Sequence, residues 1–240
     1  MSAKTIGRTV GVLFLLAYVV YLAGGALAGA GSASTVVLSH IASHQLQISA
    51  GALLMLANSA AVIGVGVLIF PTLKRHHQDS AYGYLTAQVA QGLMLAVGIV
   101  FLLLRIPLAQ EYTGAHGASA VPALAQVAQE ANHYSFWIGM VAVGAGGLLL
   151  CQVLLKENLV PRFLAIYGLA GYAIFLAGAI LEILGHNAGV ALSIPGGLFE
   201  ITFGILLIAK GFPEAQSSDY EKLARNVPPA KTAPSKAPTP

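Results

Sequence analysis

Residues 181–202 read LEILGHNAGVALSIPGGLFEIT and place two carboxylates, Glu182 and Glu200, within very apolar sequence. The stretch contains the end of one apolar run near 161–184, a short turn, and the start of another near 191–210. Each run has about 20 residues, enough at about 1.5 Å per residue to cross a hydrocarbon core of about 30 Å. The stretch therefore predicts two transmembrane helices joined by a tight turn.

The composition of the whole chain extends this prediction. Hydrophobic residues make up 57% of the 240 residues and charged residues only 9%, whereas soluble domains carry about a quarter charged residues. The sequence predicts an all-α, polytopic membrane helix bundle over residues 1–212, followed by a disordered cytoplasmic Pro/Ala/Lys-rich tail over 213–240. The six spans are expected near 9–29, 46–70, 82–104, 132–155, 161–184 and 191–210.

The basic residues indicate the topology of these spans. Of the twelve lysines and arginines, all but Arg105 fall before the first span, in the second and fourth loops, or after the sixth span. The positive-inside rule then predicts that both termini are cytoplasmic, and it explains the basic residues without a nucleic-acid partner. An alternative is that residues 3–28 are a cleaved signal peptide, which would leave five spans.

Prolines and loop composition predict where helices begin and end. Pro71 and Pro161 are expected at helix boundaries, and Ser193 with Pro195 predicts that the last helix begins only there. The outer loop segment 118–131, ASAVPALAQVAQEA, is expected to form a short separate amphipathic helix on the outer surface.

The two opening carboxylates are expected at different depths. Glu182 lies twenty residues beyond Arg162, about 30 Å along a helix, which predicts the outer boundary where water reaches it. Glu200 lies ten residues before Lys210, about 15 Å, and so near the midplane. Because a charge there costs at least about 2.5 kcal/mol, Glu200 must be protonated, paired or facing a wet cavity. A purely structural hydrogen bond between helices is the alternative interpretation.

Helical spacing predicts which faces turn inward. Gly171, Phe175, Gly178 and Glu182 share one face of the fifth span, which is expected to face the bundle. Small residues on the fourth and fifth spans could instead join copies of the chain into an oligomer. At the start of the fourth span, Tyr134 and Trp137 are expected in the interfacial aromatic belt.

Metal and cofactor signals are weak. His40 and His44 have i, i+4 spacing, and a zinc site completed by His133, His186 or Glu182 is conceivable, but no H-E-x-x-H motif accompanies them. The single cysteine, Cys151, excludes an intramolecular disulfide and a C-x-x-C motif. No cofactor is expected.

The remaining polar residues support three hypotheses. The first is an outward-facing pocket among the third to sixth spans that binds or moves a small solute. Its residues would be Glu200 as the central anchor, His133, Glu182 and Arg105 at the mouth, and Gln88, Gln91 and Asn58 in the wall. The second is an intramembrane enzyme on lipid or isoprenoid substrates that uses histidine and glutamate as acid and base. The third is a non-catalytic partner or sensor subunit.

Four segments carry a family resemblance. They are RTVGVLFLLAYVV (8–20), HYSFWIG (133–139), LVPRFLAIYGLAGYAIFL (159–176) and PGGLFEITFGILLIAKGF (195–212). Over about residues 6–212 the chain resembles the bacterial domain of unknown function numbered 4386. The resemblance implies a six-helix protein of the bacterial cytoplasmic (inner) membrane and supplies no activity.

The resemblance also bears on individual positions. It implies that the family-typical residues are Gly11, His133, Pro161, Arg162, Glu200 and Gly211. Family members often carry charges early in the second and third helices, where this chain has Gln47, Gln88 and Gln91. Because amides do not titrate, an activity that depends on those charges is not expected here.

Overall fold

The computed structural model describes residues 2–29, 35–114 and 120–213 as seven helices and no β-strand. The predicted tail lies outside the described residues apart from residue 213. The helices are α1 (Ala3–Ala28), α2 (Thr35–Ser43), α3 (Gln45–His76), α4 (Gln78–Gly114), α5 (Val121–Lys156), α6 (Arg162–Ile183) and α7 (Gly189–Lys210). Six of them, all but α2, are long and apolar enough to span a membrane, so the six predicted spans are confirmed.

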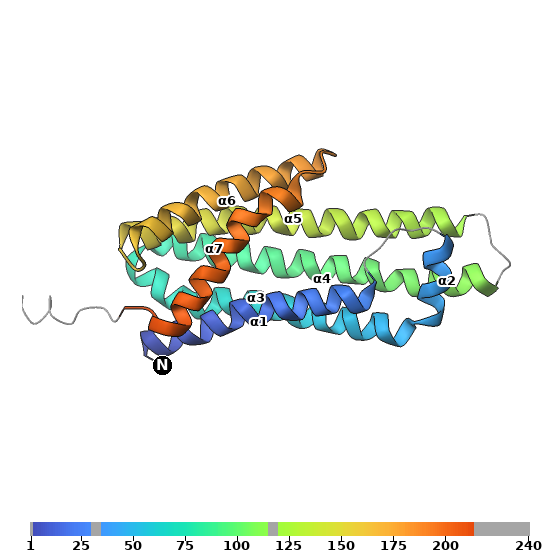
Figure 1. Cartoon of the computed structure of the whole chain (residues 1–240), viewed down its shortest axis with the longest axis horizontal. Coiled ribbons are helices and arrows are strands. Elements are labelled where there is room, and N and C mark those ends of the chain that lie inside the picture. Colours follow the sequence, from blue (N-terminus) through green and yellow to red (C-terminus); the bar gives the residue numbers. More distant parts are fainter. Residues whose placement is uncertain (1, 30–34, 115–119, 214–240) are drawn as a thin grey trace, which may run out of the picture.

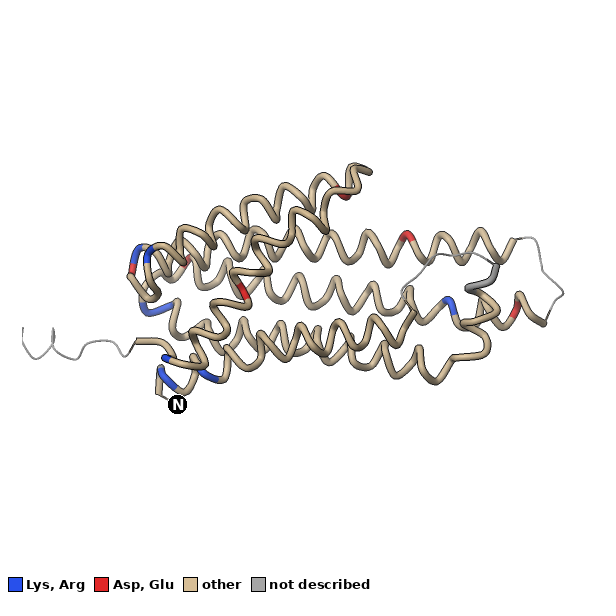
Figure 2. Tube along the Cα trace, in the orientation of Figure 1, with Lys and Arg blue, Asp and Glu red and all other residues tan. Residues whose placement is uncertain are grey.

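The six spanning helices form a ring in chain order (Figure 1). Each packs against the next, and α1 packs against α7 to close the ring. The described lysines and arginines gather at the end where α1 begins, which we call the basic end, whereas Arg105 lies toward the opposite, far end (Figure 2). This segregation along the bundle matches the charge pattern in the sequence.

Two helices extend well past α1, α6 and α7 at the far end (Figure 1). α4 has 37 residues and α5 has 36, about 55 Å each, which exceeds a hydrocarbon core of about 30 Å. The short helix α2 packs across the extension of α4, and Leu38, Ile41, Ala109 and Ala125 form a small separate core there. The prediction of a separate amphipathic helix over 118–131 is therefore wrong, because residues 121–131 are the first turns of α5.

Two predicted helix boundaries are also wrong. Pro71 lies inside α3, which continues to His76, and Pro195 lies inside α7, which begins six residues earlier at Gly189. Helices in membranes tolerate internal proline because neighbouring groups satisfy the freed backbone. Ser193 does not cap α7, since its hydroxyl donates back to the Val190 carbonyl at 2.7 Å. The Pro161 boundary is confirmed, because Pro161 is the N-cap residue of α6.

Glycines bring α1 and α7 into direct contact at the basic end. A Cβ added to Gly11 would lie 2.5 Å from the Gly204 carbonyl oxygen, so the two backbones approach as closely as the absent side chain allows. Gly211 ends α7 at a φ of 70° beside Lys4, a conformation that glycine adopts without strain. The two family-typical glycines thus both have packing roles at one helix crossing.

Candidate functional site

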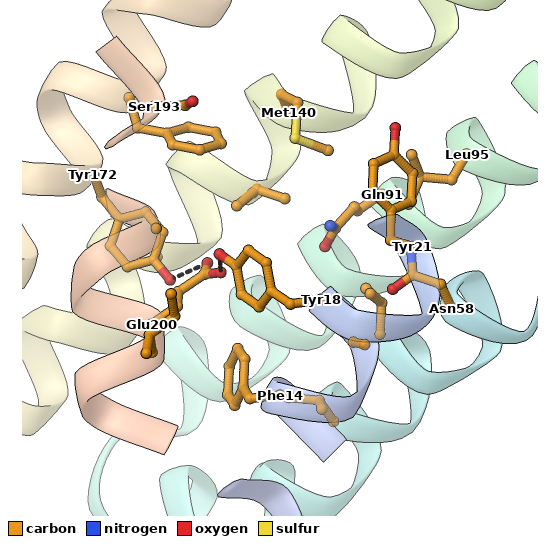
Figure 3. A pocket seen from close by; sticks show the side chains of 18 of the residues that line it. Phe14, Tyr18, Tyr21, Asn58, Gln91, Leu95, Met140, Tyr172, Ser193 and Glu200 are labelled. Carbon is orange, nitrogen blue, oxygen red and sulfur yellow. Dashed lines mark hydrogen bonds between the residues drawn. The ribbon is translucent and has the colours of Figure 1, made fainter. Parts of the chain in front are cut away.

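A carboxyl group with two tyrosine partners lies in the middle of the ring (Figure 3). Glu200 of α7 accepts a hydrogen bond at Oε1 from the Tyr172 hydroxyl of α6 at 2.6 Å, and at Oε2 from the Tyr18 hydroxyl of α1. Both carboxyl oxygens therefore have a hydrogen-bond donor. Glu200 thereby links α1, at the start of the chain, to α6 and α7 near its end. Glu200 was expected to be protonated, paired or facing a wet cavity, and in the structure it has two hydrogen-bond donors and borders a cavity.

The three residues share one depth in the bundle. Tyr18 lies ten residues after Arg8, Tyr172 ten after Arg162, and Glu200 ten before Lys210. Because all three basic residues mark the same end, each side chain lies about 15 Å from that end. Tyr18 and Tyr172 were absent from the predicted site. The sequence does contain a signal for both tyrosines, because each lies ten residues from a basic residue, as Glu200 does.

A cavity of about 710 Å³ adjoins this carboxyl group, and we call it the central chamber. All six spanning helices contribute to its wall, including α1, which the predicted pocket omitted. Eight aromatic residues line it, namely Phe14, Tyr18, Tyr21, Tyr84, Phe136, Trp137, Tyr172 and Phe175. Asn58 and Gln91 lie on the side of the chamber opposite Tyr172 (Figure 3). The chamber is thus mostly apolar, with a few polar groups at fixed places.

A second cavity of about 260 Å³ lies next to the chamber, and we call it the far-end cavity. Its wall includes Asn132, His133 and Glu182. It shares Tyr21, Leu95, Phe136, Trp137 and Val190 with the central chamber. The rings of Tyr21 and Phe136 stack with centroids 5.9 Å apart. Aromatic side chains of α1 and α5 therefore stand where the two cavities adjoin.

Glu182 has a different environment from the predicted one. Its side chain is buried, with 9% exposure, so the prediction that water reaches it freely is wrong. Its Oε2 accepts a 2.7 Å hydrogen bond from the Gly189 amide, the first residue of α7. A carboxylate at a helix N-terminus satisfies an amide that has no partner within the helix and interacts favourably with the helix dipole. Glu182 therefore explains why α7 begins at Gly189.

The predicted inward face of α6 is confirmed, since Gly171, Phe175, Gly178 and Glu182 are all buried. A Cβ on Gly178 would lie 2.6 Å from Leu192 Cβ, and one on Gly171 would lie 3.1 Å from the Pro195 oxygen. α6 and α7 therefore pack closely along this face.

His133 and Trp137 both belong to cavity walls. His133 Nε2 lies 3.9 Å from Glu182 Oε1 in the far-end cavity. Trp137 is only 4% exposed and lines both cavities, so its assignment to the aromatic belt is wrong, whereas Tyr134 is exposed. The indole of Trp137 packs where α7 begins, because Gly189 leaves room for it.

The other predicted site residues separate into two groups. Asn58, Gln88 and Gln91 line the chamber, and the buried Gln88 also donates to the Val62 carbonyl at 3.4 Å, which links α4 to α3. Arg105 is buried in α4 and lines neither cavity, so the structure does not bring it to Glu200 or His133.

The histidines proposed for a metal lie at the far end. His40 and His44 stack at 4.0 Å between ring centroids, and His44 Nδ1 lies 3.0 Å from the His40 carbonyl oxygen. Within residues 2–29, 35–114 and 120–213, no three His, Cys, Asp or Glu residues are grouped closely enough to hold a metal ion. His186 does not complete such a site with His40 and His44.

The fold and the two cavities define a multi-pass α-helical membrane protein with a chamber between its helices. The family model described as "Domain of unknown function (DUF4386)" matches residues 9–211. The chain therefore belongs to this family, and the resemblance seen in its sequence is confirmed. Comparisons with curated proteins and with solved structures gave no match.

Proposed function

We propose that this membrane protein binds a small molecule in the central chamber, with Glu200 as the polar anchor. The single observation that carries the proposal is that the carboxyl group of Glu200, which accepts hydrogen bonds from two tyrosines, borders a cavity of about 710 Å³. Ligand pockets commonly measure about 300 to 1,000 Å³ and combine apolar walls with a few polar groups that orient the ligand. The chamber has both properties.

A purely structural role explains less of the arrangement. Hydrogen bonds that only join helices need no empty volume, and close packing removes voids because a cavity in a core costs stability. Here Glu200, Asn58 and Gln91 all border the same space. A bound molecule would restore the missing contacts and use these polar groups.

The far-end cavity suggests how a solute could move. It brings His133 and Glu182 beside residues that also line the chamber, so only side chains such as Tyr21 and Phe136 separate the two spaces. Rotation of these rings would connect the cavities, which favours solute movement in addition to binding. An intramembrane enzyme would need His133 with Glu200 or Glu182 as acid and base. It is less favoured, because His133 and Glu200 line different cavities and His133 Nε2 lies 3.9 Å from Glu182 Oε1, beyond hydrogen-bond reach.

The proposal is tested by identifying molecules that co-purify with the protein. Wild-type protein is purified from native membranes in mild detergent, and its extract is compared by mass spectrometry with extracts of three variants. Glu200→Gln removes the charge, Val143→Phe fills the chamber, and Glu157→Gln is the control because Glu157 contacts His76 at the basic end.

We expect a small molecule that is enriched with wild type and with Glu157→Gln and is depleted in both chamber variants. Circular dichroism and gel filtration establish that each variant is folded. The proposal is wrong if all four proteins, folded alike, carry the same molecules in equal amounts.

A further inference from the structure

We infer that the central chamber takes a lipophilic organic cation, an ammonium group on an apolar body, which enters sideways from the membrane between α1 and α7. This inference rests on the proposed binding function and adds the ligand class and the route. It follows from three features of the chamber, namely its charge, its aromatic wall and the position of its mouth.

Any charge that the side chains of the chamber carry near neutral pH is negative. Among the described residues that line it, Glu200 is the one carboxylic acid, and none is a lysine, arginine or histidine. A carboxylate near the membrane midplane costs at least about 2.5 kcal/mol unless it is compensated. Two tyrosine hydroxyls donate to Glu200 and the wall has no positive partner for it, so a bound cation would supply the counter-charge that an ionised Glu200 lacks.

The wall suits an organic cation better than a hydrated metal ion. Eight of the 26 lining residues are aromatic, and ring faces attract ammonium groups, most strongly where water is excluded. Metal ions such as Na⁺ or Mg²⁺ need several oxygen ligands, whereas the carboxyl group here stands among mostly apolar side chains. An ammonium group on an apolar body matches both the acid and the rings.

The mouth of the chamber lies between α1 and α7. At the basic end these helices touch through Gly11 and Gly204, but toward the far end they separate (Figure 1). There α1 packs on α3, since a Cβ on Gly24 would lie 2.8 Å from the Gly51 oxygen, while α7 packs on α6. α1 and α7 therefore separate there, because α1 packs against α3 and α7 packs against α6.

The rim of this mouth is apolar and lies within the membrane-spanning segments. Five apolar residues line the chamber and are also exposed, namely Leu22 (67% exposed), Val190 (71%), Ile194 (64%), Leu198 (52%) and Ile201 (38%). Leu198 lies twelve residues before Lys210, about 18 Å from the basic end, which is inside a core of about 30 Å. A ligand that crosses the rim beside Leu198 meets hydrocarbon, so it needs an apolar body.

The test uses Trp137, the single tryptophan, as a reporter, because it lines the chamber and is almost fully buried. Protein in liposomes is titrated with 4-bromophenyltrimethylammonium, whose bromine quenches indole fluorescence on contact. The matched neutral probe is 4-bromo-tert-butylbenzene, which has nearly the same shape and no charge. Concentrations are compared as amounts in the membrane.

We expect the cation to quench wild-type protein at a concentration at least about tenfold lower than the neutral probe, since only the cation pairs with Glu200. Glu200→Gln should abolish this preference, while Glu200→Asp, which keeps the charge, should retain most of it. The comparison of the two probes on wild type decides the ligand class even if a variant fails to fold.

The route is tested with Gly197→Phe. A Cβ on Gly197 would lie 3.5 Å from the Tyr18 hydroxyl, so a phenyl group there projects into the gap between α7 and α1. Ile205→Phe is the control, because Ile205 is exposed on the same helix and does not line the chamber. We expect slower quenching only in Gly197→Phe.

Each outcome separates one claim from the others. Equal quenching of wild type by both probes overturns the cation class and leaves the binding function standing. A cation preference that survives Glu200→Gln overturns the pairing of the cation with Glu200. Equal quenching rates in Gly197→Phe and Ile205→Phe overturn the lateral route. Absence of quenching by either probe overturns the inference, whereas the binding function fails only if no co-purified molecule depends on the chamber.

Discussion

Exchanging one glycine of α1 for alanine should test the contact that closes the helix ring. In Gly11→Ala the new Cβ would lie 2.5 Å from the Gly204 carbonyl oxygen and 2.9 Å from Ile208 Cγ1, so backbone atoms must move. Overpacking of this kind costs about 1 to 3 kcal/mol. Alanine also gains up to about 1 kcal/mol over glycine in helix propensity, which partly offsets the clash.

The matched control is Gly25→Ala on the same helix, because nothing lies within 4 Å of a Cβ added there. Both substitutions gain the same helix propensity, so the difference between their free energies of unfolding measures the cost of the clash. We expect Gly11→Ala to unfold with a free energy about 1 to 3 kcal/mol below that of Gly25→Ala. The assay is reversible unfolding in mixed micelles titrated with sodium dodecyl sulfate and followed by circular dichroism. Equal unfolding free energies would refute the close approach of α1 and α7.

Three further substitutions or measurements address the interior. Tyr172→Phe removes one hydroxyl donor from the central carboxyl group and should cost about 1 to 2 kcal/mol in the same unfolding assay, whereas the exposed Tyr167→Phe should change it by less than about 0.5 kcal/mol. Glu182→Gln weakens the cap on the Gly189 amide, so hydrogen exchange at the first turn of α7 should speed up, and unchanged exchange would contradict the capping role. Cys151 is fully buried and should resist maleimide until the protein unfolds, so labelling of the folded protein would contradict its placement.

The fold could be predicted from the sequence because each span depends mainly on local composition. A run of about 20 apolar residues has to become a helix in a membrane, since its backbone has no other hydrogen-bond partners there. Helix ends were less predictable. The start of α7 depends on Glu182, which lies in another helix, so the local Ser193 and Pro195 pattern pointed to the wrong residue.

The candidate site was only half predictable for a related reason. Glu200 is conspicuous because an acid in an apolar run is costly, but tyrosine is common in membrane proteins and its default place is the interface. The residue type alone therefore did not mark Tyr18 or Trp137 as site residues. In the structure Tyr18 donates a hydrogen bond to Glu200, and Trp137 lines both cavities. Hydropathy also does not reveal that α1 packs beside α7.

The positions of small residues explain why a ring of six helices keeps a hollow interior. Along α1, Gly11 brings α7 close near the basic end, and Gly24 brings α3 close near the far end. One straight helix cannot keep both neighbours equally close along its whole length, so α1 and α7 separate above their contact (Figure 1). Tyr18 lies between these two glycines in the chain, and its hydroxyl donates a hydrogen bond from α1 to Glu200 of α7. The same glycines that hold the ring together therefore determine where it opens, and the opening lies beside Glu200, the one carboxyl group among the described residues that line the chamber.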